Sequence, residues 1–243
     1  MVCLLPFYKA IRSLHQTGSA CLLTMAIALT ACQTNNDAGS NFKVFTKIPA
    51  QQSGISFENK VDENYDKNYF DRFAYVYNGA GVAVGDINND GLPDIYFTGN
   101  EVPNKLYLNK GKMQFDDITE SAGVAGTKGW DNGVTFVDIN NDGYLDIYVC
   151  KGGFEDKDED RINLLYVNQG NNTFKEEAAV YGLADNGYST HAVFFDMDND
   201  NDLDVYITSR PDSFYLGLSR MVSGKRNPPD KCRDKLYKNE NGR

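Results

Sequence analysis

Oxygen-bearing side chains recur at a fixed spacing in three short loops of this sequence. The loops span residues 86–94, 138–146 and 196–204, and each has oxygen side chains at positions 1, 3, 5 and 9. Calcium takes six to eight hard oxygen ligands at roughly 2.3–2.6 Å. Because carboxylates at alternate positions of a tight loop can converge on one ion, the spacing predicts three calcium sites.

The predicted ligands are the side chains at positions 1, 3, 5 and 9 and, by analogy with the EF-hand loop, the main-chain carbonyl of position 7. In chain order they are Asp86, Asn88, Asp90, Leu92, Asp94, Asp138, Asn140, Asp142, Tyr144, Asp146, Asp196, Asp198, Asp200, Asp202 and Asp204. Glycine at position 6 of the first two loops permits a sharp turn, since it tolerates positive φ. Asn201 replaces it in the third loop, and asparagine also visits that region.

An EF-hand does not fit these loops. It has a glutamate at position 12 and a helix on each side, whereas position 12 here is Phe97, Val149 or Ile207, each inside an apolar run typical of a β-strand. A single copy is also explained as a solvated turn, since Asn, Asp and Gly dominate turns. Three copies between similar apolar runs favour the metal.

The charge of the chain agrees with cation binding. The formal net charge is −10, and eleven of the 34 acidic residues lie in the three loops. Nucleic acid is not expected as a partner, because it requires a basic surface.

The first 31 residues predict a bacterial lipoprotein signal peptide. Lys9 and Arg12 form a basic region, and residues 20–31 are apolar or small. This run is too short to span a bilayer as a stable helix. Leu29-Thr30-Ala31-Cys32 resembles a lipobox, which predicts Cys32 as the lipidated first residue of the mature chain. An ordinary secretory signal or a short membrane anchor is the alternative.

The lipoprotein hypothesis places the mature chain in the bacterial cell envelope, lipid-anchored at the outer membrane or cell surface. Residues 32–40 are then a flexible polar tether. Removal of two basic residues changes the formal charge from −10 to −12. Cys150 and Cys232 remain as a possible disulfide in an exported protein, although Cys150 also suits a small core residue at a strand end.

Each loop joins the first two of several short predicted strands. A third strand follows at 105–109, 164–168 and 235–239, and a fourth at 114–118 and 173–177. Four short strands joined by tight turns are typical of a propeller blade. A β-sandwich is the alternative, but it does not explain the recurring loop. We therefore predict an all-β fold, an incomplete β-propeller of about three to four blades over residues 41–243.

The residues before the first unit are harder to interpret. Residues 45–48 and Gly54-Ile55 echo the fourth strand and its following segment in the first unit. We predict that this lead-in contributes a lone outer strand.

Residues 77–86, Tyr-Asn-Gly-Ala-Gly-Val-Ala-Val-Gly-Asp, followed by the acidic loop, resemble the FG-GAP/VCBS repeat of integrin-α-type β-propellers. The resemblance covers roughly residues 42–243 and extends to exported bacterial VCBS-repeat proteins, some of which end in an ASPIC/UnbV domain. It implies calcium in the loop between the first two strands of each blade. Three units do not close the seven-bladed ring that it implies, so we expect a fragment of a longer protein.

The connection between the second and third strands lengthens along the chain. From the last loop aspartate to the third-strand tyrosine there are 13, 20 and then 33 positions. Insertions on one face often mark a binding face. The third insertion is locally basic, which predicts an acidic glycan or protein surface as partner; a solvated loop is the favoured alternative. Its basic residues are Arg210, Arg220, Lys225, Arg226, Lys231 and Arg233.

These patterns favour an exported calcium-binding module that recognises a protein or polysaccharide. The alternative is part of a carbohydrate-active enzyme whose catalytic residues lie outside this chain. His191 is the single histidine after the signal segment, and no nucleophile motif is present. No catalytic residue is therefore predicted. A third interpretation makes the repeats a passive spacer.

Overall fold

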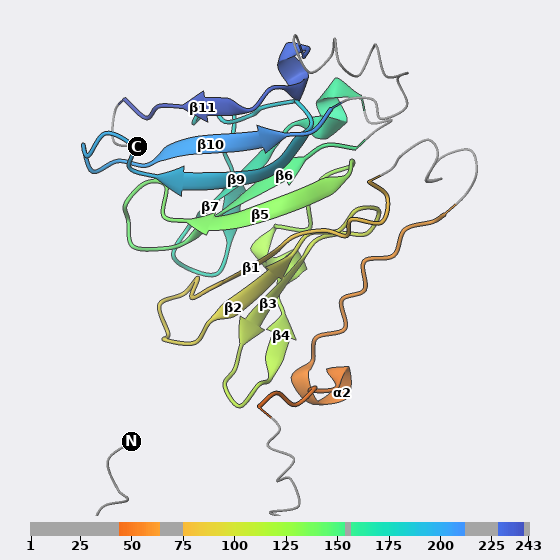
Figure 1. Ribbon diagram of the computed structural model, residues 1–243. Helices are drawn as coiled ribbons and strands as arrows, with labels where there is room; N and C mark the ends of the chain where they lie inside the picture. Colours follow the sequence, from red (N-terminus) through yellow and green to blue (C-terminus); the bar gives the residue numbers. More distant parts are fainter. Residues whose placement is uncertain (1–43, 64–74, 154–156, 212–227, 241–243) are drawn as a thin grey trace, which may run out of the picture. The chain divides into compact units, whose positions relative to one another are not determined.

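The computed structural model describes residues 44–63, 75–153, 157–211 and 228–240 (Figure 1). The chain separates into two units, residues 1–47 and 48–243, and every described strand lies in the second. The expected signal peptide and Cys32 lie outside the described residues. Within the part that is described, no helix has the length and apolar character needed to cross a membrane.

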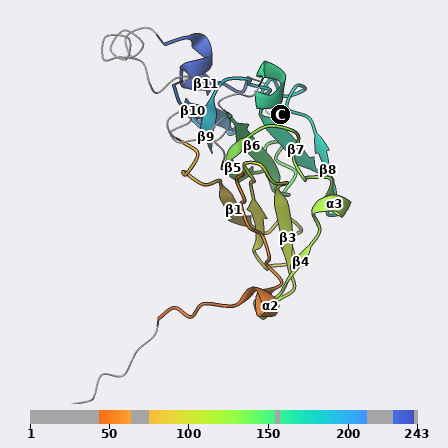
Figure 2. The same ribbon diagram turned by 90° about the vertical axis from the view of Figure 1, so that its right-hand side faces the viewer.

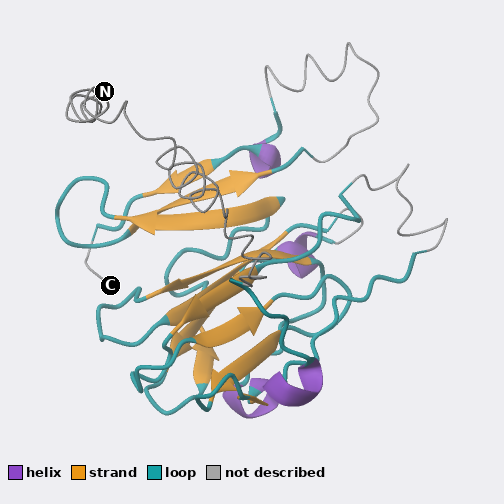
Figure 3. Cartoon of the chain, turned by 60° about the horizontal axis from the view of Figure 1, so that its bottom comes forward, coloured by secondary structure: helices purple, strands orange, loops and turns teal. Residues whose placement is uncertain are grey.

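The described strands form three antiparallel sheets, each in chain order. The first contains β1 (Val82–Gly85), β2 (Asp94–Phe97), β3 (Lys105–Asn109) and β4 (Phe115–Asp117). The second contains β5 (Asp131–Val137), β6 (Asp146–Lys151), β7 (Leu164–Asn168) and β8 (Phe174–Glu176). The third contains β9 (Ser189–Phe195), β10 (Asp204–Ser209) and β11 (Lys235–Tyr237). The helices are single turns: α2 (Ala50–Ser53), α3 (Thr119–Ala122), η2 (Asp158–Arg161) and η3 (Asp230–Cys232) (Figure 3).

The prediction of an all-β fold is confirmed. The three sheets pack face to face in chain order, since β1 contacts β5 and β5 contacts β9 (Figures 1 and 2). The FG-GAP-type pattern of four short strands recurs in the first two sheets and three strands of it in the third. This arrangement agrees with successive blades of a β-propeller, and the described residues do not form a closed ring.

Equivalent side chains build the two interfaces between sheets. Tyr96 of the first sheet and Tyr148 of the second are fully buried and occupy the same register position. Each hydroxyl donates to a main-chain carbonyl, Tyr96 to Val124 at 2.7 Å and Tyr148 to Leu183 at 3.0 Å. Burial of a tyrosine requires such a partner for its hydroxyl. The repeat therefore specifies both the buried tyrosine ring and the hydrogen-bond acceptor of its hydroxyl.

The predicted lone outer strand before the first sheet is wrong. Residues 45–48 form neither a strand nor a helix, and helix α2 begins after Pro49. Pro49, which precedes the helix, has no N–H to donate to a neighbouring strand. Gly54 ends the helix in the left-handed region, with φ of 79°, where glycine has no Cβ clash.

The two cysteines do not pair in the described structure. Cys150 is buried in β6 and Cys232 is partly exposed in η3, and no disulfide joins them. Burial raises the pKa of the Cys150 thiol well above its ordinary value. Cys150 thus packs as a small apolar core residue.

Candidate metal centres

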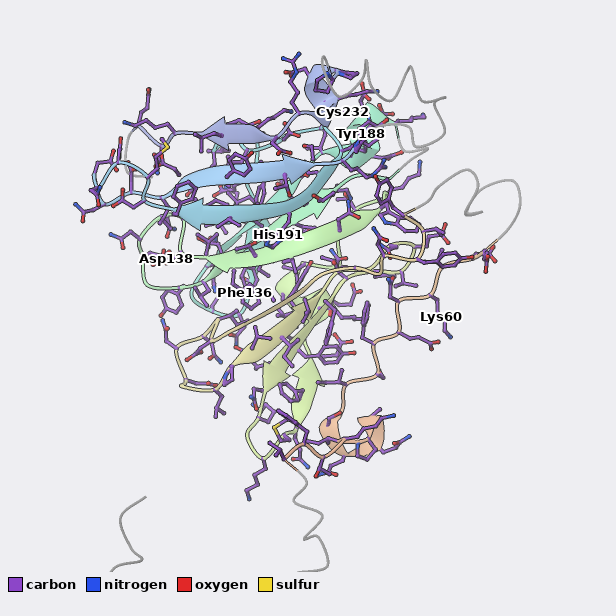
Figure 4. All side chains as sticks on the ribbon, viewed as in Figure 1. Lys60, Phe136, Asp138, Tyr188, His191 and Cys232 are labelled. Carbon is purple, nitrogen blue, oxygen red and sulfur yellow. The ribbon has the colours of Figure 1, made fainter. Side chains whose placement is uncertain are left out.

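The three acidic loops lie where the sequence predicts them, between the first two strands of each sheet. They connect β1 to β2, β5 to β6 and β9 to β10. The first two loops are adjacent in space, because the Asn89 side-chain amide donates to the Gly143 carbonyl at 2.9 Å. Figure 4 shows Asp138 at this end of the sheets and Tyr188 and Cys232 at the other.

The aspartate at position 9 of each loop is buried and fixes the loop to its sheet. Asp94, Asp146 and Asp204 are each at most 1% exposed. One carboxylate oxygen of each accepts the N–H of loop position 2, at 3.0, 2.9 and 2.9 Å. The other accepts the N–H of an asparagine at or just beyond the end of the third strand, at 2.7, 2.7 and 2.8 Å. This aspartate is therefore a structural anchor as well as a predicted ligand.

The partner asparagines were missed as site residues from the sequence. They are Asn109, Asn168 and Asn239. Each stands two positions after the tyrosine of the third strand, and this recurrence is the sequence pattern that could have identified them. Side-chain amides of the first two also donate to loop carbonyls: Asn109 to Pro93 at 2.8 Å, and Asn168 to Leu145 at 3.1 Å. Asn168 additionally donates to Ile87 of the preceding loop at 2.8 Å.

The aspartate at position 1 organises the rest of each loop. Asp86 accepts the N–H groups of Asn88, Asp90 and Gly91 at 3.3, 3.2 and 2.7 Å. Burial alone would raise the pKa of Asp86, but these N–H donors hold it below its ordinary value. Asp138 and Asp196 accept from their own loops in a similar way.

The loops turn through two residues with left-handed backbone. Position 6 has φ of 84° at Gly91, 86° at Gly143 and 70° at Asn201. The prediction that Asn201 adopts the conformation of the glycines is therefore confirmed. Position 4 is asparagine in every copy and also has positive φ, between 57° and 63°. Asparagine tolerates this region better than most residues, which explains its recurrence there.

The second loop contains the most strongly perturbed carboxyl of the three. Burial raises the pKa of Asp146 to about 6, and nearby Asp142 and Asp138 raise it further, against two N–H donors. Burial also raises the pKa of Asp94. A cation would have to displace a proton from Asp146 below about pH 6, so protons and cations compete for this site.

The third loop has the densest group of carboxylates. Oxygens of Asp196, Asp198 and Asp204 all lie within 4.8 Å of one another. The Lys238 ammonium donates to Asp198 and lies 4.0 Å from Asp200. Its hydrogen bond holds the pKa of the Asp198 carboxyl below its ordinary value. A lysine of the protein itself thus supplies positive charge to this loop.

The residues present fit a hard divalent cation. All side-chain candidates offer oxygen, and the 4.8 Å spread in the third loop suits oxygens around an ion with bonds of roughly 2.3–2.6 Å. In the first two loops the amide at position 3 donates to the carboxylate at position 5, at 3.1 and 2.8 Å. These contacts bring positions 3 and 5 together. The carbonyl role of Leu92, Tyr144 and Asp202 stays a prediction.

At the opposite end of the sheets the long connections of the second and third repeats meet around Tyr188. Arg161 and Arg210 stack on its ring, 4.5 and 4.6 Å from the centroid, and Lys231 lies at 5.2 Å. Arg210 also donates to the Gly152 carbonyl at 3.1 and 2.6 Å. The described parts of these two connections thus meet at the end remote from the loops.

The predicted basic patch needs one correction. Arg210 is 6% exposed, because its guanidinium packs on Tyr188 and donates to main-chain carbonyls. It is therefore not a surface charge of the third insertion. Arg220, Lys225 and Arg226 lie outside the described residues. Lys231 and Arg233 keep access to solvent.

A family model described as FG-GAP-like repeat matches residues 86–149 and 156–207, which contain all three loops. This match to FG-GAP-like repeats suggests a binding module of β-propeller type.

The chain is also similar to cartilage acidic protein 1. The protein of Xenopus tropicalis is 32% identical over 131 residues, 54% of this chain and 20% of the relative. Those of Mus musculus and Homo sapiens are each 30% identical over 131 residues, again 54% of this chain. The matched segment covers 20% and 19% of these two relatives, so it spans about a fifth of their length.

Proposed function

We propose that this protein is an exported, calcium-binding module of β-propeller type that binds a protein or polysaccharide. The three loops support the calcium role. The N-terminal pattern supports export and a lipid on Cys32, which would attach the module to a membrane of the bacterial cell envelope. Bound calcium would neutralise the loop carboxylates, while the position-9 aspartates keep each loop fixed to its sheet.

The repetition of one hydrogen-bonded loop in three sheets is the observation that carries the calcium proposal. In each copy, position 1 gathers main-chain N–H groups and position 9 joins the loop to the third strand. Carboxylates this close repel one another, and a dication removes that cost. A solvated turn requires neither the shared spacing nor the buried ninth residue.

Calorimetric titration of the purified protein with calcium tests this proposal, together with thermal unfolding in calcium and in chelator. We expect about three sites per chain from the three loops. Calcium at about 100 times its dissociation constant should stabilise the fold by about 2.7 kcal/mol per site. Binding should weaken between pH 7.5 and pH 5, because Asp146 gains a proton with a pKa of about 6.

Asp142→Asn provides the specific variant and Asp116→Asn the control. Both remove one exposed negative charge, but Asp116 lies in β4, outside the loops. Asp142→Asn should weaken one site about tenfold or more, equivalent to about 1.4 kcal/mol, and Asp116→Asn should leave all sites unchanged. If calcium gives neither binding heat nor stabilisation of the folded wild-type protein, the calcium proposal is contradicted.

The end of the sheets around Tyr188 is the proposed binding face. Two connections meet there, and Lys231 presents a cation on a chain with a net charge of −10. Such local positive charge suits an acidic glycan or an acidic protein surface. A sulfated polysaccharide should bind the wild-type protein, and Lys231→Glu should weaken that binding roughly tenfold.

Lys110→Glu is the matched control for this face. Lys110 is exposed and directly follows β3, at the end where the loops lie. Equal weakening by both substitutions would indicate a general charge effect and contradict the assignment of the face. Binding of a neutral polysaccharide at equal strength would contradict the acidic partner.

A further inference from the structure

The third loop carries more negative charge than the other two. It contains five aspartates, whereas the first and second loops contain three each. The two additional carboxylates are Asp198 at position 3 and Asp202 at position 7. Position 3 is asparagine in the first two loops, where its amide donates to the carboxylate at position 5 at 3.1 and 2.8 Å. An ionised aspartate only accepts hydrogen bonds, so Asp198 cannot make this link.

Lys238 supplies a donor at the same place. Its ammonium donates to Asp198 and lies 4.0 Å from Asp200 at position 5. Lys238 stands between the tyrosine and the asparagine at the end of the third strand, where the first two repeats have Leu108 and Val167. Both of these apolar side chains are buried. The third repeat thus differs from the others by an acid at position 3 and a base after the tyrosine, and the two form one ion pair.

This ion pair lies beside the point where a cation is expected. Oxygens of Asp196, Asp198 and Asp204 lie within 4.8 Å of one another. The Lys238 ammonium is hydrogen-bonded to one of these three carboxylates. Two positive charges a few ångströms apart repel each other. Lys238 and a bound dication therefore compete for the same carboxylates.

Building on the calcium role proposed above, we propose that Lys238 is an internal counter-ion of the third loop, which calcium must displace from Asp198 in order to bind. The third site then binds calcium more weakly than the first two, although it has the most carboxylates. The number of charged ligands would by itself give the opposite order. Without calcium, the ammonium offsets part of the repulsion among the five aspartates, a contribution that the first two loops lack.

Calorimetric calcium titration of Lys238→Leu tests this role. Leucine is the residue that the first repeat has at this position. The titration is made in a background of Asp90→Asn and Asp142→Asn, two exposed loop positions, which weakens the first two sites so that the third can be measured. Lys238→Leu should raise the calcium affinity of the third site about tenfold or more. Lys238→Arg keeps the charge and should leave that affinity low.

Lys105→Leu is the matched control. Lys105 also lies on a third strand, and its ammonium pairs with Asp117, outside the loops, at 2.8 Å. The side chains of this pair are 31% and 38% exposed, compared with 45% and 35% for Lys238 and Asp198. Lys105→Leu should leave the affinity of the third site unchanged. In chelator, Lys238→Leu should lower the melting temperature more than Lys105→Leu, because five aspartates lose their only neighbouring ammonium among the described residues.

Two results would overturn the role of Lys238 and leave the calcium role intact. One is calcium binding to the first two loops with no gain at the third site in Lys238→Leu. The other is an equal gain in Lys105→Leu, which would indicate a general effect of net charge. If no loop binds calcium in the wild-type protein or in any variant, the calcium role itself fails, and the competition by Lys238 fails with it.

Discussion

Asp146→Ala is expected to lower the free energy of unfolding by about 3 kcal/mol, measured by urea denaturation in chelator. The carboxylate is buried and accepts the N–H groups of Ile139 and Asn168 at 2.9 and 2.7 Å. Alanine leaves both donors without their acceptor, and a buried unsatisfied donor costs about 1–3 kcal/mol. The expected loss is below the sum of two such costs, because burial of the charged carboxylate is itself unfavourable, as its raised pKa shows.

Asp142→Ala is the control in the same loop. Asp142 is exposed, and its oxygens accept hydrogen bonds from within the loop at 2.8 and 2.9 Å. Its loss in chelator should cost less than about 1 kcal/mol, as for most surface substitutions. Both variants should weaken calcium binding. Equal destabilisation in chelator would show that the ninth residue is not the anchor of the loop.

Lys151→Ala is expected to destabilise the protein by about 3–5 kcal/mol, since removal of one partner leaves a buried charge uncompensated. The Lys151 side chain is fully buried, and its ammonium lies 2.8 Å from Asp131. It also donates to the Thr127 hydroxyl at 2.9 Å and to the Lys128 carbonyl at 3.1 Å. Asn104, which directly precedes β3 of the first sheet, donates to the same Asp131 carboxylate at 2.7 Å, so the loss extends to the interface between the sheets.

Lys128→Ala tests whether burial causes this effect. The Lys128 side chain is 80% exposed, although its ammonium lies 3.0 Å from Asp160. Exposed ion pairs contribute about 0–1 kcal/mol. Urea denaturation of both variants should therefore separate them clearly, and similar losses would contradict the role assigned to the buried pair.

Much of the fold could be predicted from the sequence because its information is local and repeated. Asn and Gly at the turn positions specify left-handed backbone wherever they stand. Alternating apolar residues on either side of a loop specify two antiparallel strands. Three copies of this combination therefore predicted the loops, their flanking strands and the stacking of equivalent sheets.

The remaining features depend on residues that are distant in the sequence. The Asn168 side chain bonds to a carbonyl 81 positions earlier, and no local pattern encodes that distance. Lys151 and Arg210 look like surface cations until the packing of neighbouring sheets buries them. Residues 45–48 were mistaken for a strand because their apolar residues resemble those of β4, and the later contact of Phe57 with Phe97 of β2 could not be foreseen from that local pattern.

Three of the hydrogen bonds of Asn168 have a geometric consequence for the packing of the sheets. Contact between apolar faces is non-directional, so two such sheets could slide along each other at little cost. Asn168 donates hydrogen bonds to Asp146 and Leu145 of its own repeat and to Ile87 in the loop of the preceding repeat. These hydrogen bonds therefore fix how far one sheet is shifted along its neighbour. Apolar residues at the interface can then change during evolution without altering the shift between neighbouring sheets.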